Sequence, residues 1–537
     1  MRAVPSSTDL PPVRVEQALG IRASYSEGAG IYRIVPAAVA LPENVEELRA
    51  LVRWAHAGRV PLVPRGAGSG MGGGNVGEGV VVDLTRGFAE PLEVHPGRAM
   101  AGAGVVYRSL AEAALATGQR LPPEPSSGRF CTLGGMVACN AAGARSLAHG
   151  AMRAWVEAVE VVWADGTCGW VRRGDHGRWP VERSLARLVE RSASLIRSRF
   201  PSTAKNASGY ALDRYLETGD LLDVLVGSEG TLAIVTRCVV RLAPVPEHRA
   251  SVLVALRSLD DLGRAVATIV ALRPSALELL ERTFLDLAGA DPAGVPPDSP
   301  AVLIGEFEGD SHASASTAVG RVAREMAAIG ATVTTGVTTA DEAALWAIRH
   351  AASPALARLP ETRRSLQVIE DGCVPLPALA EYVAGIRDAA RRHEVEVVLF
   401  GHAGDGHVHV NALVDLTRPG WKAQLRDLFA EVTALVTRLG GTVSGEHGDG
   451  RLRAAALGRT YGPAVAALFA EVKRLFDPDG ILNPGVVIPD GRDPFDGLKV
   501  GAEAVAIPDS VARALRAMER EGRWGASKLE LGRTPKS

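Results

Sequence analysis

Residues 65–75 read Arg-Gly-Ala-Gly-Ser-Gly-Met-Gly-Gly-Gly-Asn and separate two strand-like segments, 60–64 and 80–84. Residues 68–73 match the dinucleotide fingerprint G-x-G-x-x-G, which opens a helix in a Rossmann fold. Here the loop leads into a second strand, so a Rossmann fold is not expected. The backbone N–H groups of such a loop can surround a pyrophosphate. A flexible linker is the alternative, and the regular structure predicted on both flanks argues against it.

A second segment rich in small residues spans 131–143, after the proline-rich stretch 121–127. Small side chains let the backbone approach a large flat ligand closely. Tight packing of a helix against a sheet uses the same residue types, so this segment alone leaves both interpretations open. A further glycine-containing segment, 227–234, leads into a predicted strand that ends near residue 242.

Regular elements are predicted along most of the chain. Asn44 is the predicted N-cap of a helix, with Glu47 three residues later as in a capping box. Residues 159–163 and 169–172 predict a β-hairpin. From about residue 250 onward, predicted strands and helices alternate: 251–256, 259–272, 301–308 and 313–329. This alternation is typical of an α+β domain whose sheet is covered by helices.

Chemically active side chains are densest in the segment 401–411, Gly-His-Ala-Gly-Asp-Gly-His-Val-His-Val-Asn. His407, His409 and Asn411 alternate with valines, so a strand would project them from one face. The preceding residues, 395–400, are strand-like as well, and the glycines between the two predict a turn. The sequence therefore predicts two adjacent strands that bring imidazoles together.

The pairing of these strands would place His402 beside His409, and a second motif downstream, Gly-Glu-His-Gly-Asp-Gly at 445–450, adds Glu446 and His447. Two imidazoles and one carboxylate suit a zinc-type divalent ion with a coordination position left open. His447 would then stand beside the ion, free to move a proton. The alternative is a glycine-rich loop with solvated histidines, and the crowding of histidines in this region argues against it.

Composition excludes several classes of protein. A chain of 537 residues, 47% hydrophobic and 22% charged, predicts two or three globular domains. The net charge of −2 predicts no nucleic-acid partner, and no apolar run reaches the length of a transmembrane helix. The first residues lack a signal-peptide pattern, which predicts a cytoplasmic protein. The five cysteines form no Cys-x-x-Cys pair, which argues against an iron–sulfur cluster on this chain.

Six motifs follow one another along the chain: PRGAGSGMGGG, PPEPSS, TLGGMVACNAAG, GSEGTLAI, GHAGDGHVHVN with GEHGDG, and ILNPG. Together they resemble the flavin-linked D-2-hydroxy acid dehydrogenases. That group includes D-lactate dehydrogenases, D-2-hydroxyglutarate dehydrogenase and the flavin subunit of bacterial glycolate oxidase, within the vanillyl-alcohol oxidase/p-cresol methylhydroxylase fold family. The resemblance spans about residues 30–489.

The resemblance implies an α+β protein with a two-part FAD-binding domain of the p-cresol methylhydroxylase type and an α+β cap domain with an antiparallel sheet. The implied divisions are a lead-in (1–30), the FAD-binding domain (31–245), the cap domain with the substrate and metal sites (246–475), a C-terminal return to the FAD domain (476–497) and a tail without assigned role (498–537).

The resemblance also implies how FAD is held. Residues 66–71 would cradle the pyrophosphate, while 132–143 and 230–234 would line the adenosine and isoalloxazine. The implied cofactor-binding residues are Arg65, Gly66, Ala67, Gly68, Ser69, Gly70, Met71, Ser127, Thr132, Gly134, Gly135, Asn140, Gly143, Gly230, Ile234 and Asn483. Covalent relatives carry a histidine in the first glycine loop. None stands between residues 65 and 83, so the resemblance implies non-covalent FAD.

The metal ligands implied by the resemblance are His402, His409 and Glu446, with zinc as the expected divalent ion and His447 as the catalytic base. Arg349 matches an arginine that binds the substrate carboxylate, and Asn411 is expected to contact substrate. A guanidinium binds a carboxylate in bidentate fashion. For Arg349 alone, a surface arginine on a helix is the alternative.

Two departures from the family pattern concern the site. The family usually has Asn where His407 stands, so His407 could tune the site, add a ligand or face solvent. Glu370 and Asp371 replace a lysine-containing segment that helps hydroxyglutarate enzymes hold a second carboxylate. A glutamate there would repel that group, which argues against a dicarboxylate substrate. Large relatives also carry an iron–sulfur module after the Asn-Pro-Gly motif, and we expect none on this chain.

These expectations describe an FAD- and metal-dependent dehydrogenase of a short 2-hydroxy acid such as D-lactate. Its electrons would pass to a separate acceptor, namely an iron–sulfur protein, a cytochrome or a quinone. Such a dehydrogenase is compatible with peripheral contact with the inner membrane and with assembly as a homodimer. One rival function is an alkylglycerone-phosphate synthase-like transferase, and the sequence shows no strongly amphipathic segment for membrane docking. A second rival is a non-catalytic flavin subunit, and the intact histidines argue against it.

Overall fold

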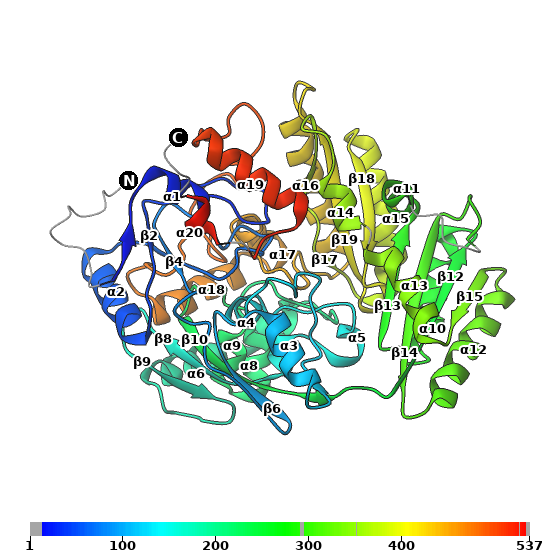
Figure 1. Ribbon diagram of the computed structural model, residues 1–537, viewed down its shortest axis with the longest axis horizontal. Helices are drawn as coiled ribbons and strands as arrows, with labels where there is room; N and C mark the ends of the chain where they lie inside the picture. The colour runs from blue at the N-terminus through cyan, green and yellow to red at the C-terminus, as the bar shows by residue number, and fades with distance from the viewer. Residues whose placement is uncertain (1–12, 290–294, 351, 526, 533–537) are drawn as a thin grey trace.

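The computed structural model describes residues 13–289, 295–350, 352–525 and 527–532. The start of the predicted lead-in and the end of the predicted tail lie outside these ranges. Helices combine with largely antiparallel sheets, so the fold class is α+β. In Figure 1 the first half of the chain and the segment around α18 lie on the left, and the large sheet of the middle segment lies on the right.

The glycine-rich segment 65–75, called the glycine loop below, lies between two parallel strands of a small sheet. This sheet has the order β1-β2-β4-β3. Its strands are β1 (Val15–Glu16), β2 (Ala38–Ala40), β3 (Leu62–Arg65) and β4 (Val80–Asp83). The predicted capping of helix α2 (Val45–Gly58) is confirmed, because the Asn44 side chain accepts a hydrogen bond from Glu47 N at 3.0 Å. Since β3 and β4 pair in parallel with no helix between them, the loop itself makes the crossover.

A five-stranded antiparallel sheet follows, in the order β5-β6-β10-β8-β9. Its strands are β5 (Leu92–His95), β6 (Arg98–Gly102), β8 (Val156–Val162), β9 (Cys168–Arg172) and β10 (Ile234–Arg241). The predicted hairpin is β8–β9. The second small-residue segment forms α4 (Leu133–Cys139), which packs against β10. The other helices here are α3 (Tyr107–Leu115), α5 (Ser146–His149), α6 (Pro180–Arg191), α7 (Ala193–Arg199), α8 (Leu212–Thr218) and α9 (Leu221–Leu225).

The third large sheet carries the histidine motif and has the path β15-β12-β14-β13-β18-β19-β16, with β17 beside β19. Its strands are β12 (His248–Leu256), β13 (Ala276–Glu281), β14 (Ala301–Gly309), β15 (Thr332–Gly336), β16 (Arg363–Leu366), β17 (Gly372–Cys373), β18 (Glu396–Gly401) and β19 (His407–Asp415). Its helices are α10 (Leu262–Val270), α11 (Arg282–Ala288), α12 (His312–Ala328), α13 (Thr339–His350), α14 (Ala352–Ala357), α15 (Leu379–Arg392) and α16 (Trp421–Arg438). The strands and helices predicted between residues 251 and 329 are therefore confirmed, although the helix expected from 259 starts with a 3-10 turn and ends at Val270.

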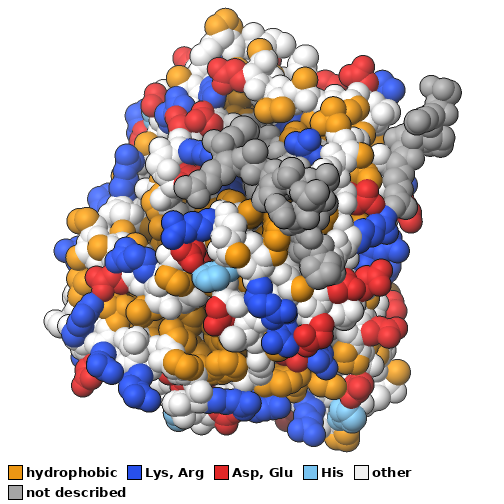
Figure 2. Space-filling view, turned by 90° about the vertical axis from the view of Figure 1, so that its left-hand side faces the viewer, with side chains coloured by type: hydrophobic (Ala, Val, Ile, Leu, Met, Phe, Trp, Pro, Cys, Tyr) orange, Lys and Arg blue, Asp and Glu red, His pale blue; other side chains and the backbone are white. Residues whose placement is uncertain are grey.

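The end of the chain returns to the first half. After α17 (Leu457–Thr460) and α18 (Pro463–Phe476), Leu482 bridges to Leu62 of β3 in parallel. Helix α19 (Asp509–Glu521) and α20 (Lys528–Leu531) then pack on α1 (Leu19–Ser24), and the three lie together in Figure 1. On the face shown in Figure 2, basic and acidic side chains are interspersed with apolar ones. No described helix is long and apolar enough to cross a lipid bilayer.

Candidate functional site

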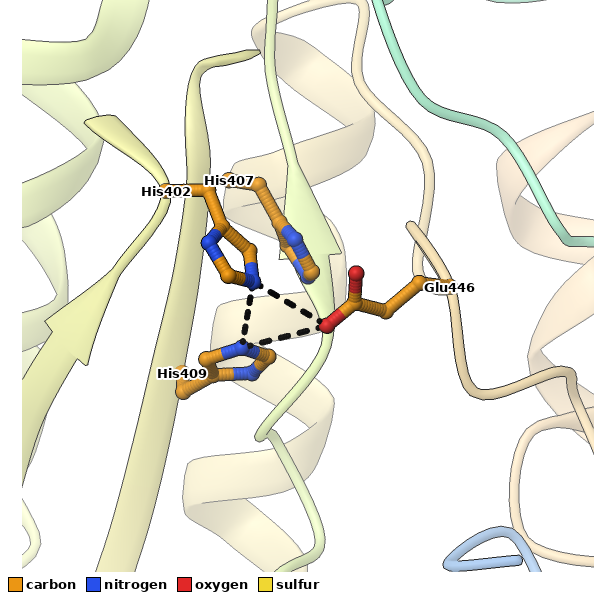
Figure 3. Close-up of side chains that lie close together, drawn as sticks. All are labelled: His402, His407, His409 and Glu446. Carbon is orange, nitrogen blue, oxygen red and sulfur yellow. Dashed lines mark hydrogen bonds and ion pairs between the residues drawn. The ribbon is translucent and has the colours of Figure 1, made fainter. Parts of the chain in front are cut away.

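Two neighbouring strands bring the predicted imidazoles together. His402 directly follows β18, and Phe400 of that strand pairs with His409 of β19. The Nε2 atoms of His402 and His409 lie 3.4 Å apart. Glu446 Oε1 completes the group, 3.2 Å from His402 Nε2 and 3.4 Å from His409 Nε2 (Figure 3). The three side chains predicted as metal ligands therefore converge on one point, from two adjacent strands and a distant loop.

Hydrogen bonds on the far side of each ring fix which nitrogen faces that point. His402 Nδ1 lies 2.6 Å from the carboxylate of Glu278, and His409 Nδ1 lies 2.9 Å from the carbonyl oxygen of Glu370. Both partners can only accept, so each Nδ1 carries a hydrogen, and in the neutral form of each ring the Nε2 lone pair is directed inward. Outer partners of this kind orient imidazoles for metal binding. The donor set thus fits a zinc-type ion.

Glu278 was not anticipated from the sequence. It lies on β13 with its side chain fully buried and contacts Arg349 Nε as well as His402, each at 2.6 Å. Burial alone would raise the pKa of this carboxyl, but the charges of His402 and Arg349 lower it to about 2. An acidic residue inside the apolar strand Ala-Leu-Glu-Leu-Leu-Glu is a signal that could have pointed to it, because buried carboxylates require partners.

His447 points toward the same place from the neighbouring loop. Its Nδ1 lies 2.5 Å from Glu370 Oε2, and its Nε2 lies 3.7 Å from Glu446 Oε1. The side chain is 27% exposed, which leaves it accessible. Burial disfavours the charged ring, but Glu370 and Asp371 raise the pKa of His447 to about 10 when no ion is bound. The positive charge of an ion at the neighbouring ligands would lower this pKa again and favour the neutral ring that can accept a proton. Arg453 binds the other oxygen of Glu370, so the glutamate faces His447 and Arg453 together.

Asp371 holds the loop that carries Glu446 and His447. Its carboxylate accepts hydrogen bonds from Ser444 Oγ at 2.6 Å and from the main-chain N–H of His447 at 2.9 Å. It also contacts His407 Nε2 at 2.9 Å. The acidic pair Glu370-Asp371, considered from the sequence only for its repulsion of substrate, therefore builds the loop of the site.

His407 is fully buried, and both of its ring nitrogens have partners. Because Asp371 only accepts, His407 Nε2 carries the hydrogen, and its Nδ1 accepts from Lys205 Nζ at 3.4 Å. Burial and the charge of Lys205 lower its pKa to about 3. Of the three roles left open by the sequence, exposure to solvent is wrong, because the side chain is 0% exposed.

Two predicted substrate contacts lie beside the imidazoles. Arg349, on α13, donates from Nε to Glu278, and its guanidinium lies 4.8 Å from the ring centre of Phe400. Its Nη groups make no hydrogen bond within the described part of the chain. Asn411, on β19, is 4% exposed, and its Oδ1 accepts from Ser365 at 3.2 Å. Both residues thus keep donors for a further ligand.

The glycine loop fits a phosphate-bearing cofactor. Among the described residues, nothing accepts a hydrogen bond from the main-chain N–H groups of residues 66–71. The side-chain oxygens of Asn75 and Asn483 are buried next to this loop. Neither accepts a hydrogen bond from the residues that the structure describes. Free N–H groups suit the pyrophosphate of FAD, and orphaned acceptors suit its hydroxyl groups. The alternative of a flexible linker is not supported, because Gly450 and Gly72 are in backbone contact.

Other residues predicted to bind the cofactor support the loop itself. The Arg65 guanidinium donates to the carbonyl oxygens of Tyr25, Glu27 and Asn75. The Asn483 amide donates to Gly74 O and Glu229 O, and Asn140 Oδ1 accepts from Arg153 N. Several predicted glycines stand where a Cβ atom would meet neighbours within 3.3 Å: Gly66, Gly68, Gly70, Gly134, Gly135, Gly143 and Gly230.

The remaining predicted cofactor residues divide by exposure. Thr132 is the N-cap of α4 and accepts from Gly135 N at 3.3 Å. Ile234 opens β10 and is 1% exposed. Ala67, Ser69, Met71 and Ser127 are partly exposed, so they can contact a ligand. In the small-residue segment 131–143, the structure has the packing of α4 against β10, and contact with a large flat ligand stays a prediction.

Comparison with known proteins agrees with this geometry. Residues 36–172 match the family described as FAD binding domain, and residues 245–487 match FAD linked oxidases, C-terminal domain. The glycolate oxidase subunit GlcD of Bacillus subtilis (strain 168) is 32% identical over 468 residues, which cover 84% of this chain and 89% of that protein. The chain belongs to the FAD-linked oxidase family. The predicted resemblance is confirmed at this level.

A second relative in the family is the D-lactate dehydrogenase of Archaeoglobus fulgidus, 31% identical over 456 residues that cover 84% of this chain and 91% of that protein. The crystal structure of p-cresol methylhydroxylase with substrate bound superposes with a TM-score of 0.65 and 14% identity, covering 89% of this chain and 95% of that one. This likeness confirms the predicted p-cresol methylhydroxylase type of fold.

Proposed function

We propose that the protein is a dehydrogenase that oxidises a short D-2-hydroxy acid, of the D-lactate type, to the 2-oxo acid. The observation that supports this most directly is the convergence of His402 Nε2, His409 Nε2 and Glu446 Oε1 within 3.4 Å of one another, with His447 beside them. FAD, bound non-covalently, would accept the hydride at N5. A zinc-type ion at the three ligands would lower the pKa of the substrate hydroxyl.

The protein's own groups position the substrate and move its proton. His447 Nε2 takes the hydroxyl proton, while its Nδ1–H stays hydrogen-bonded to Glu370. Arg349 binds the substrate carboxylate through the Nη groups that Glu278 leaves free. Asn411 supplies an amide donor from the same face of β19 as His409. The residues predicted around loop 66–71 hold FAD.

The names of the relatives mention different 2-hydroxy acids. Glu370 is the residue from which we infer whether the substrate carries one carboxylate or two. Its carboxylate is 3% exposed and lies among His447, Arg453 and Asp371. We propose that the two acidic side chains of this cluster, Glu370 and Asp371, repel a second carboxylate on the substrate. A monocarboxylate is therefore the proposed substrate class, as the sequence suggested.

The other parts of the proposal concern organisation and electron transfer. We propose the domain limits given above, with residues 31–245 around FAD and 246–475 carrying the substrate and metal sites. Electrons would leave to a separate iron–sulfur protein, cytochrome or quinone. A cytoplasmic protein, free or peripheral at the inner membrane and compatible with a homodimer, fits this scheme.

The test is an anaerobic titration of the purified flavoprotein with D-lactate, L-lactate, glycolate and D-2-hydroxyglutarate, followed by the visible flavin spectrum. Bleaching by D-lactate and not by L-lactate supports the proposal. Bleaching by D-2-hydroxyglutarate alone would overturn the substrate class. A flavin spectrum that no acid alters would favour the transferase or the non-catalytic subunit. Metal analysis of the same sample tests the ion.

A further inference from the structure

Lys205 is a buried cation in contact with one of the proposed metal ligands. Its side chain is 3% exposed, and its Nζ lies 2.8 Å from Glu446 Oε2 and 3.6 Å from Asp405 Oδ2. It reaches the site from the segment between α7 and α8, more than 200 residues before Glu446 in the sequence. Nothing in the proposed chemistry uses this lysine.

The two oxygens of Glu446 consequently have different surroundings. Oε1 faces His402 Nε2 at 3.2 Å and His409 Nε2 at 3.4 Å, whereas Oε2 accepts a hydrogen bond from Lys205. A carboxylate whose second oxygen is held by an ammonium group offers a single oxygen to an ion between the two imidazoles. The contact thus selects one-oxygen binding by Glu446.

Charge balance explains why a lysine stands there. Glu446 and Asp405 have side chains only 7% and 3% exposed, and buried carboxylates are costly unless they are paired. The lysine supplies the positive charge that these carboxylates need when no ion is bound.

His407 keeps Lys205 in place. An ammonium group has donors only, so the contact of 3.4 Å between Lys205 Nζ and His407 Nδ1 uses the lone pair of that nitrogen. The other ring nitrogen is held by Asp371 at 2.9 Å. Although His407 lies within reach of the ligand group, both of its nitrogens are already engaged. His402 and His409 are the imidazoles with inward lone pairs.

We propose that Lys205 is a positioning residue that substitutes for the charge of the metal ion and restricts Glu446 to one-oxygen coordination, with His407 bracing the lysine and not binding the ion. This inference rests on the metal site of the proposed function. Removal of the ammonium charge destabilises the metal-free protein more than the metal-bound protein, which retains the charge of the ion. Divalent ions should therefore bind more tightly to a neutral variant.

The test is a titration of chelator-treated, FAD-loaded protein with Co²⁺, comparing wild type with Lys205→Gln and Lys205→Met. We expect both variants to bind Co²⁺ about tenfold more tightly, and to show a lower Tm without metal and a larger rise in Tm with it. Glutamine retains a hydrogen-bond donor but no charge, so the same direction in both variants assigns the effect to charge. A merely structural role predicts weaker binding, since loss of an outer partner usually weakens metal sites 10–100-fold.

Lys499→Met is the matched control, because Lys499 is similarly buried and pairs with Glu519 at 3.0 Å in a different part of the fold. Its Co²⁺ affinity should equal that of wild type. Weaker or unchanged binding in both Lys205 variants would overturn the inference and leave the proposed function intact. Failure of wild type to bind any divalent ion would overturn the metal site as well.

His407→Asn gives a second measurement that does not depend on the Lys205 variants. The Co²⁺ absorption spectrum and the stoichiometry of one ion should remain those of wild type, because His407 is not a ligand. A changed ligand-field spectrum or loss of the ion would show that His407 coordinates, and the inference would then fail.

Discussion

The carboxylate of Glu370 lies 2.5 Å from Nδ1 of His447, a residue 77 positions later in the chain. The contact orients the ring so that its other nitrogen, Nε2, lies 3.7 Å from Glu446 Oε1. A carboxylate behind an imidazole fixes its tautomer and stabilises the charge that develops when the ring takes a proton. The pair therefore gives His447 the arrangement of a general base.

Replacement of this base should impair chemistry and spare cofactor binding. We expect His447→Gln to lower the rate of flavin reduction by D-lactate about 10²–10⁴-fold, the usual range for a general base. FAD content and metal content should remain those of wild type, because His447 is not among the proposed ligands. Stopped-flow measurement of flavin bleaching tests this, and an unchanged rate would contradict the proposed role.

Removal of the carboxylate behind His402 should weaken the metal site. Glu278→Gln cannot accept from both His402 Nδ1 and Arg349 Nε as the carboxylate does. We expect divalent-ion affinity to fall about 10–100-fold, as for other outer partners of metal-bound imidazoles. Competition with a chromophoric chelator measures this. Glu503→Gln, at an exposed surface ion pair, is the control, and equal affinities in the two variants would refute the expectation.

Replacement of Arg349 should weaken binding of the substrate carboxylate. Arg349→Lys retains the charge and loses the planar pair of donors, so we expect KM for D-lactate to rise about 10-fold or more. The methyl ester of the substrate, which lacks the carboxylate charge, serves as the matched control and should respond far less. Steady-state kinetics with both compounds provides the comparison. An equal loss for acid and ester would assign Arg349 a structural role through Glu278.

The contact between two glycines should be intolerant of a side chain. Gly450 has φ of 56°, and a Cβ atom there would lie 1.9 Å from Gly72 O. Gly450→Ala should therefore displace the loop 445–450 from the glycine loop and lower FAD occupancy, with a loss of stability of about 1–3 kcal/mol. Flavin absorbance per protein and urea unfolding measure the two effects. Gly458→Ala, where a Cβ atom meets nothing within 4 Å, should change neither.

Stability should depend on pH through Glu229, which lies between the same two loops. Burial, followed by the nearby charge of Asp449, raises the pKa of Glu229 to about 8. Because this folded-state pKa exceeds the ordinary value, protonated Glu229 stabilises the fold. Its contribution to the free energy of unfolding is complete below about pH 4.5 and is lost as pH rises through 8. Glu229→Gln should thus raise the free energy of unfolding at pH 9 relative to wild type by about 1 kcal/mol or more. Urea unfolding at pH 5.5 and 9 tests this, and identical pH slopes in both proteins would rule it out.

The site was predictable from sequence where the information is local. The alternation of His407, His409 and Asn411 with valines predicts a strand and its shared face, and the structure has both. The predicted meeting of His402 with His409 follows from the turn between two adjacent strands. The six ordered motifs likewise indicated the family, because each is a short stretch of residues with its own local pattern.

Residues that act from a distance gave no comparable signal. Lys205, Glu278 and Glu370 reach the site from three different segments, and no spacing in the sequence links them to the histidines. Pairing of β13 with β18 brings in Glu278, the loop after α7 carries Lys205, and pairing of β17 with β19 brings in Glu370, which lies just before β17. Charge compensation in a buried site is a property of the assembled fold, so it could be recognised only in three dimensions.

The backbone contact between Gly72 and Gly450 has a thermodynamic consequence. Gly72 directly follows residues 66–71, which are proposed to hold FAD, and Gly450 ends the segment that carries Glu446 and His447. Arg451 N and Leu452 N both donate to Gly72 O, so neither loop can shift without the other. Two ligands that order one shared contact influence each other's affinity by the same factor. Flavin and metal ion would then assemble the site cooperatively, each acting as an effector of the other.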